Sequence, residues 1–167
     1  IDDTEFEVEA GQNLIQAAAK VGIEIPHYCY HPGLSVSGNC RMCLVEVKGP
    51  RGTMAQIACN TPVAEGLEVY TQTPTVKKMR QGVMEFLLLN HPIDCPICDQ
   101  AGECGLQDYY MEYALYSNRS TVPKVEKDKV VDVGPMVMLD QERCILCSRC
   151  VRFCGEVTQT HELVITQ

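Results

Sequence analysis

The stretch CYHPGLSVSGNCRMC, residues 29–43, is the most informative part of the first third of the chain. Neither a helical nor a strand period survives across residues 25–41, and prolines and glycines interrupt them, so we expect one long loop. A loop of this length inside a compact domain is usually functional. Three cysteines lie on this stretch and a fourth follows it, in the spacing Cys29-x10-Cys40-x2-Cys43-x15-Cys59.

Two kinds of site fit these four cysteines. Four thiolates, three from one loop and one from a strand end, can hold two irons, and the Cys-x2-Cys pair gives the close bite on one side. The first gap is longer than the four residues of plant-type ferredoxins. A structural zinc site also suits one Cys-x2-Cys pair with two remote cysteines, although zinc more often uses two short-spaced pairs. We therefore expect a [2Fe–2S] cluster, with zinc as the alternative.

Regular elements are predicted on both sides of the loop. Polar and apolar residues alternate from Thr4 to Ala10, which is the period of a half-buried strand. Asn13 can cap a helix that runs to about Val21, where Gly22 stops it. Strand patterns with a Lys48–Gly52 turn between the first two follow at residues 43–48, 54–59 and 67–71. Residues 1–74 thus indicate one small strand–helix–strand domain.

A second group of donors begins where a predicted helix ends. Apolar residues recur at three and four from Val76 to Leu87, so we expect an amphipathic helix from about Thr75 to His91, because Pro92 cannot continue it. The donors follow as His91-x3-Cys95-x2-Cys98-x5-Cys104. A neutral imidazole can replace one thiolate on a [4Fe–4S] cluster, and the smaller negative charge favours the reduced form. The alternatives are zinc with three Cys and one His, and a capping role for the histidine.

The third group is Cys144-x2-Cys147-x2-Cys150-x3-Cys154, the spacing of bacterial ferredoxins. In that run the fourth cysteine binds another cluster and is followed by Pro, whereas Gly155 follows here. We expect three ligands, Cys144, Cys147 and Cys150, for a second [4Fe–4S] cluster whose fourth ligand lies elsewhere. A helix that starts near Cys147 places Cys154 one turn beyond Cys150, and we expect a buried, unligated thiol there.

The remaining segments complete a four-part organisation. A helix with Leu106 and Tyr113 follows the second group, and a polar, charge-mixed connector follows that helix. Short strands are expected at residues 136–139 and 163–166, with a loop that turns into a helix over residues 144–157. The parts are residues 1–74, 75–116, the connector 117–135, and a partial domain 136–167.

Composition limits the possible functions. The 167 residues include 11 cysteines, no Trp and three Phe. We therefore expect several small domains with thin cores, which need disulfides or bound metals for stability. An odd number of cysteines, without a secretory signal or an apolar run of about 18 residues, favours metal over disulfides. The net charge of −8 argues against nucleic-acid binding. Membrane contact is expected only through partner subunits.

Four stretches carry a family resemblance: GNCRMCLVE (38–46), GVMEFLLLNHP (82–92), DCPICDQ (94–100) and RCILCSRCVR (143–152). Together and in this order they resemble the N-terminal iron–sulfur region of the large G-type subunit of respiratory complex I. The resemblance implies an α+β architecture: a β-grasp [2Fe–2S] ferredoxin domain, a small helical His–Cys [4Fe–4S] domain, and the start of a ferredoxin-like [4Fe–4S] domain. By position, its ligands fall on the three groups described above, and the missing fourth ligand of the last cluster is expected beyond Gln167.

The same resemblance implies a function. Electrons would come from an FMN subunit that oxidises NADH, enter at the [2Fe–2S] cluster and leave through other iron–sulfur subunits toward quinone. The chain would carry electrons within NADH:quinone oxidoreductase, without substrate chemistry of its own. It would be peripheral, on the cytoplasmic side of a bacterial inner membrane or on the mitochondrial matrix side.

Two other functions remain open from the sequence. The front ends of [FeFe] hydrogenases, NAD-linked formate dehydrogenases and NAD-reducing hydrogenases share these modules. A zinc-stapled interaction module without a redox role belongs to a different class. Visible absorption separates that class from the others, because zinc sites are colourless.

Overall fold

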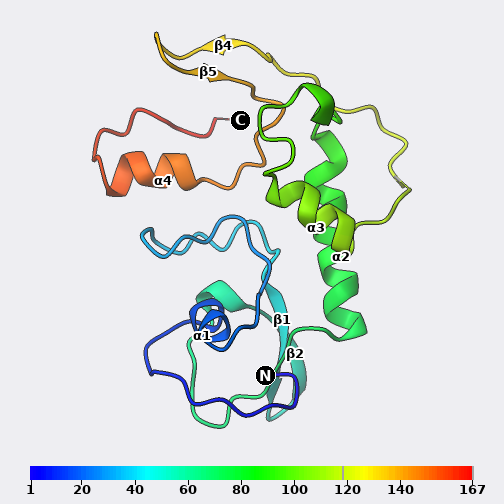
Figure 1. The fold of residues 1–167 in the computed structure, drawn as a ribbon, viewed down its shortest axis with the longest axis vertical. Coiled ribbons are helices and arrows are strands. Elements are labelled where there is room, and N and C mark those ends of the chain that lie inside the picture. The colour runs from blue at the N-terminus through cyan, green and yellow to red at the C-terminus, as the bar shows by residue number, and fades with distance from the viewer. Residues whose placement is uncertain (118, 167) are drawn as a thin grey trace. The chain divides into compact units, whose positions relative to one another are not determined.

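The computed structural model describes residues 1–117 and 119–166 (Figure 1). Asn118, inside the expected connector, and Gln167, at the end of the expected last domain, lie outside the described residues. The chain divides into two compact units: unit 1 comprises Ile1–Arg80 with Cys147–Gln167, and unit 2 comprises Gln81–Leu146.

The first helix of unit 1 begins at the residue that the sequence indicates. In α1 (Leu14–Lys20), the Asn13 side chain accepts the Gln16 N–H at 3.0 Å, and the Gln16 side chain accepts the Asn13 N–H at 3.2 Å. This reciprocal pair is a capping box, which satisfies two backbone donors that the helix start would leave unpaired. Gly22, at φ +79°, follows the last turn. The predicted helix and its cap are confirmed.

A three-stranded antiparallel sheet in the order β2-β1-β3 packs against α1. Its strands are β1 (Leu44–Gly49), β2 (Gly52–Ile57) and β3 (Val69–Tyr70), and the short 3-10 helix η1 (Ala58–Asn60) follows β2. Strands were predicted at these three places and are confirmed, with small shifts at their ends. The core contains Leu14, Ala18, Ile25, Val45 and Val69, each at most 5% exposed.

The prediction of a strand from Thr4 to Ala10 is wrong. This segment is exposed and, among the described residues, forms no strand ladder. A tight turn precedes the segment, with φ of +45° at Asp2 and +63° at Asp3. In this turn the Thr4 N–H donates to the Ile1 carbonyl oxygen at 3.0 Å. The Asp2 N–H donates to the Val69 carbonyl oxygen. Alternation indicates which side chains can face a core, but a strand also needs a hydrogen-bonding neighbour.

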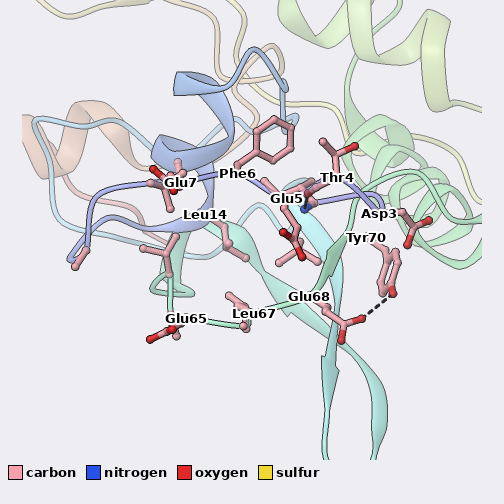
Figure 2. A pocket seen from close by; sticks show the side chains of 18 residues that line it. Asp3, Thr4, Glu5, Phe6, Glu7, Leu14, Glu65, Leu67, Glu68 and Tyr70 are labelled. Carbon is pink, nitrogen blue, oxygen red and sulfur yellow. Dashed lines mark hydrogen bonds between the residues drawn. The ribbon is translucent and has the colours of Figure 1, made fainter.

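A cavity of about 1190 Å³ lies beside this segment (Figure 2). Leu14 and Leu67 form part of its apolar lining. Its lining also includes five carboxylates, from Asp3, Glu5, Glu7, Glu65 and Glu68. So many acidic groups disfavour an anionic ligand here.

The long helix α2 (Pro74–Asn90) belongs to unit 1 as far as Arg80 and to unit 2 from Gln81. Its start is fixed by Thr73, whose hydroxyl accepts the Val76 N–H at 3.1 Å, and by Pro74 at the first helical position. The helix ends at Asn90, one residue before the predicted end at His91, and Pro92 follows two residues later. Arg80 is fully buried and donates to the Leu44 carbonyl oxygen at 3.1 Å.

Unit 2 continues with the 3-10 helix η2 (Cys95–Ile97), the helix α3 (Gly105–Tyr113) and a two-stranded ribbon of β4 (Val131–Asp132) and β5 (Met138–Leu139). The helix α3 and the strand near residues 136–139 were predicted and are confirmed. The expected connector is not free of regular structure, because β4 pairs antiparallel with β5. A two-residue strand is too short to leave a period in the sequence.

The last helix, α4 (Arg149–Glu156), returns to unit 1. It starts two residues later than Cys147, because Ser148 has a left-handed backbone with φ of +61°, which a right-handed helix excludes. The strand expected at residues 163–166 is not formed in the described part of the chain.

Candidate metal centres

The first cysteine group lies in the core of unit 1. Cys29, Cys43 and Cys59 are each 1% exposed, and Cys40 is half-buried. Cys43 directly precedes β1 and Cys59 lies in η1, just after β2. The β1–β2 register aligns Leu44 with Ile57, and the Ala58 N–H donates to the Cys43 carbonyl oxygen at 3.0 Å. The hairpin therefore brings Cys43 and Cys59 together at its open end.

The four thiols form one electrostatically coupled group. A hydrogen bond from the Cys59 thiol lowers the pKa of Cys43 to about 7. Donating that hydrogen bond, together with burial and the neighbouring thiols of Cys29 and Cys40, raises the pKa of Cys59. Thiolates that interact in this way repel one another, so the donor set fits a positively charged iron centre.

Backbone N–H groups also face these sulfurs. The Cys29 N–H donates to Cys40 Sγ at 3.5 Å. Burial raises the pKa of the Cys40 thiol, while N–H groups of Cys29 and Met42 oppose this shift. Amide donors of this kind stabilise negative charge on sulfur, as they do around iron–sulfur clusters.

Backbone conformation shapes the loop around this group. Arg41, between two of the cysteines, has φ of +59°. Gly38 has φ of +65°, and a Cβ atom built there would lie 3.0 Å from Ile57 Cδ1. Glycine fits this position for two reasons, its freedom at positive φ and its lack of a side chain.

The second group starts at the end of α2. His91 Nδ1–H donates to the Pro92 carbonyl oxygen at 2.9 Å, since a carbonyl can only accept. The other ring nitrogen, Nε2, then carries the lone pair that a metal needs, and a backbone carbonyl is a common partner for the N–H of a ligating histidine. The imidazole therefore fits the place of a neutral ligand.

Successive turns present the other three donors of this group. The Cys98 N–H donates to the Cys95 carbonyl oxygen at 3.2 Å, and the Ala101 N–H donates to that of Cys98 at 3.0 Å. Cys104 is the N-cap of α3. All four donors are half-buried. In the part of the chain that the structure describes, no three His, Cys, Asp or Glu side chains lie close enough together to hold a single metal ion.

An ion-pair network ties the turn at Cys95 to the connector. Lys129 Nζ lies 2.5 Å from both Asp94 Oδ2 and Glu142 Oε2, and Arg143 Nε lies 2.9 Å from Asp140. The hydrogen bond from Lys129 lowers the pKa of the Asp94 and Glu142 carboxyls. Sequence reasoning missed this network, and the only local signal was an acidic residue directly before Cys95.

The third group is divided between the two units. In unit 2, Cys144 is exposed and its Sγ accepts the Leu146 N–H at 3.4 Å. In unit 1, Cys147 is half-buried and Cys150 is exposed. Burial raises the pKa of Cys147, but the hydrogen bond and charge of Arg149 outweigh this, so the net shift is downward.

Cys154 is half-buried, whereas the sequence predicted a buried thiol. No residue of α4 is buried, so this helix covers none of its side chains fully. One further residue of α4, Arg152, contacts carbonyl oxygens of two cysteine loops and was not singled out from the sequence. A basic residue inside the cysteine run was the available signal.

Sequence comparison matches the chain to three family models in order. Residues 1–74 match a 2Fe-2S iron-sulfur cluster binding domain, residues 80–119 the NADH-ubiquinone oxidoreductase-G iron-sulfur binding region, and residues 134–167 the ferredoxin-like domain of NADH-quinone oxidoreductase subunit 3. The chain is thus an α+β iron–sulfur protein with 2Fe–2S and 4Fe–4S domains.

Similar proteins of known name indicate which kind of iron–sulfur protein the chain resembles. It is 48% identical over 164 residues to the NADH-quinone oxidoreductase G subunit of Rickettsia felis, and the match covers 98% of this chain and 24% of that protein. It is 50% identical over 167 residues to the NADH-ubiquinone oxidoreductase 75 kDa subunit of Reclinomonas americana, covering 98% and 23%. The chain contains the iron–sulfur region of these NADH-quinone oxidoreductase subunits, and it spans about a quarter of the length of these curated relatives.

A solved structure is also similar. A chain from the crystal structure of an NAD+-reducing [NiFe]-hydrogenase in the H2-reduced state superimposes with a TM-score of 0.87 at 30% identity. The match covers 99% of this chain and 68% of that one.

Proposed function

We propose that this chain relays single electrons within an NADH:quinone oxidoreductase. The observation that carries the proposal is the first cysteine group, four thiols of which three are buried in the core of a domain whose family model binds 2Fe–2S clusters. The name of the relatives, NADH-quinone oxidoreductase, supports a flow of electrons from NADH toward quinone. A flavin subunit that oxidises NADH is proposed as the donor. The chain carries electrons and transforms no substrate itself.

Three ligand sets are proposed. A [2Fe–2S] cluster takes Cys29, Cys40, Cys43 and Cys59. One [4Fe–4S] cluster takes His91, Cys95, Cys98 and Cys104, and a second takes Cys144, Cys147 and Cys150 with a fourth ligand beyond Gln167. Iron–sulfur clusters supply one-electron chemistry, with potentials set by charge, hydrogen bonds and exposure.

The residues of the chain have distinct tasks in this function. The β1–β2 hairpin holds two thiols of the first group at a fixed separation, and backbone N–H groups stabilise their negative charge. The core around them excludes water, which limits the reorganisation that electron transfer requires. His91 donates Nδ1–H to a carbonyl oxygen, which orients the ring and leaves Nε2 as the nitrogen that can bind iron.

Partners and location follow from the same proposal. The partners are the FMN subunit and other iron–sulfur subunits of the complex. No helix among the described residues is long and apolar enough to cross a membrane. We propose a peripheral position, on the cytoplasmic side of a bacterial inner membrane or on the matrix side of a mitochondrial one, with membrane contact through partners.

The test uses the full-length protein, purified anaerobically with its flavin subunit. NADH should reduce it and produce the axial electron paramagnetic resonance signal of a [2Fe–2S] centre. Cys59→Ser should abolish that signal and leave the [4Fe–4S] signals, while Cys154→Ser should keep all of them. A [2Fe–2S] signal that survives in Cys59→Ser overturns this ligand set, and a colourless wild-type protein overturns the function.

A second candidate function is the front end of an NAD-reducing hydrogenase. The solved structure of such an enzyme, with a TM-score of 0.87, favours it. Its iron–sulfur part would feed electrons from hydrogen to NAD+ instead of from NADH to quinone. The two are separated by whether the NADH-reduced complex is reoxidised by a quinone, or whether hydrogen reduces it instead.

A further inference from the structure

The helix α4 contacts the loop of the first cysteine group inside unit 1. Arg152 Nη1 donates to the Ser35 carbonyl oxygen at 2.5 Å. Glu156 accepts from the Ser35 N–H at 2.8 Å and from its hydroxyl at 2.5 Å. Ser148 donates to Ser37 Oγ at 3.2 Å. Residues more than 110 positions apart in the sequence are therefore joined by several polar contacts.

One side chain in this contact joins two cysteine loops. The second terminal nitrogen of Arg152, Nη2, donates to the Cys29 carbonyl oxygen and, at 3.5 Å, to the Cys147 carbonyl oxygen. Its Nε donates to Ser148 Oγ at 3.2 Å. A guanidinium presents five N–H donors in one rigid plane, so a single arginine can fix several acceptors in relation to one another.

The charge of Arg152 matters as much as its shape. Arginine stays protonated in proteins, and this one is half-buried, where solvent screens a charge less than at the surface. It lies beside residues of the first and the third proposed ligand sets. A positive charge near an anionic cluster stabilises the reduced form, which has one more negative charge.

We propose that Arg152 is a positioning residue for electron transfer, which holds the loop of the [2Fe–2S] cluster against the loop that contains Cys147 and raises the potential of both clusters. This inference rests on the proposed ligand sets. Electron tunnelling slows steeply with distance, so a side chain that fixes two ligand loops against each other sets the rate of transfer between their clusters.

The experiment uses the full-length protein within its complex and compares Arg152→Gln with Arg152→Lys. Arg149→Gln is the matched control, because it removes the same charge from the same helix, while the contact of Arg149 is to the Cys147 thiol alone among the contacts described. The readouts are iron content, the midpoint potential of each cluster, and the relaxation enhancement of the [2Fe–2S] signal by the reduced neighbouring cluster.

We expect Arg152→Gln to lower both potentials, so that the reduced-to-oxidised ratio at a fixed potential falls about tenfold, equivalent to about 59 mV for one electron. It should also weaken the relaxation enhancement. Arg152→Lys keeps the charge and should preserve the potentials, but it lacks the planar fork and should still weaken the enhancement. Arg149→Gln should shift only the cluster that includes Cys147.

Unchanged potentials and unchanged relaxation in Arg152→Gln would overturn the proposal, even if the thermal stability fell, because a merely structural residue changes stability alone. If Arg152→Gln loses iron, Ser35→Ala and Glu156→Gln are used instead. They weaken the contact between α4 and the first cysteine loop, and they keep the hydrogen bonds of Arg152 to the Cys29 and Cys147 carbonyl oxygens. Weaker relaxation in these variants supports the proposal, and unchanged relaxation overturns it. A wild-type protein without the clusters rejects the proposed function instead.

Discussion

The first and second donor groups differ in what holds them in place. Three thiols of the first group, Cys29, Cys43 and Cys59, are buried next to a sheet and to α1, and the Cys59 thiol hydrogen-bonds to Cys43. The donors of the second group are half-buried on a run of short turns between α2 and α3. The first site is built from long-range packing, the second from local chain reversals.

Because of this difference, we expect the two sites to depend on their clusters to different degrees. A site fixed by strand pairing and core packing keeps its donors together by the protein's own stability. A site fixed by single-turn hydrogen bonds has little else to order it, so the cluster itself must supply much of the order.

Removal of all iron from the full-length protein by a chelator under reducing conditions should affect the two regions unequally. Amides of Val45 and Val47 in β1 should keep most of their protection from hydrogen exchange. Amides of Cys98 and Ala101 should exchange nearly as fast as an unfolded chain, because their hydrogen bonds are local and poorly buried. Ala18 in α1 serves as the internal reference. Equal loss of protection in both regions would contradict the contrast.

The cysteines of α4 test whether burial marks a ligand. In the first group three of the four proposed ligands are buried, whereas in α4 the proposed ligand Cys150 is exposed and the proposed free thiol Cys154 is half-buried. Cys150→Ala should remove a whole cluster, about four irons per chain, and Cys154→Ala should remove none. Iron analysis of the full-length subunit measures this. Equal loss in both variants would make Cys154 a ligand.

His91 tests the charge of the second site. His91→Cys should keep a cluster and lower its potential by on the order of 100 mV, because a thiolate adds a negative charge that a neutral imidazole lacks. A redox titration followed by electron paramagnetic resonance measures this. The same exchange at the exposed His161 is the control and should change nothing. A potential that stays the same in His91→Cys would show that the imidazole is not a ligand.

Two glycines give the smallest effect. Both have positive φ, but they differ in the space that an added methyl group would enter. At Gly38, in the first loop, the methyl carbon would lie 3.0 Å from Ile57 Cδ1, whereas at Gly102, in the second loop, it would meet nothing within 4 Å. Gly102→Ala should cost about 1 kcal/mol from the left-handed backbone alone. Gly38→Ala should cost about 2 kcal/mol, since crowding adds to the same strain.

Local opening free energies from hydrogen exchange measure both costs. The control is Gly82→Ala inside α2, where the backbone is helical and a methyl group meets no neighbour, so it should stabilise the helix by about 0.5–1 kcal/mol. A larger cost at Gly102 than at Gly38 would reverse the proposed order of packing in the two loops.

The elements that the sequence predicts well are those with local signals. Asn13 and Gln16 define the start of α1 within four residues, and Pro92 defines the end of α2. The strand expected at Thr4–Ala10 fails, because strand formation depends on a neighbour that the pattern does not contain. The ribbon of β4 and β5 is too short for any period.

For the candidate sites too, the sequence predicts what depends on local spacing and does not predict contacts between distant segments. Cysteine spacing alone nominates all three donor groups, because ligand residues must recur within short loops. It does not reveal Arg152, whose contacts with Cys29 and Ser35 join segments more than 110 residues apart. The sequence also overestimates the burial of Cys154. Helical position predicts on which face of α4 a residue lies, but it does not predict what covers that face.

The unequal exposure of the cysteines has a consequence for oxidative damage. Oxidation of thiols to sulfenic and higher acids follows their exposure and thiolate character. Cys144 and Cys150 are exposed, the cysteines of the second group are half-buried, and Cys29, Cys43 and Cys59 are sealed in the core. Peroxide should therefore damage the chain from its C-terminal cysteine run inward, and the [2Fe–2S] domain should be the last to lose its thiols.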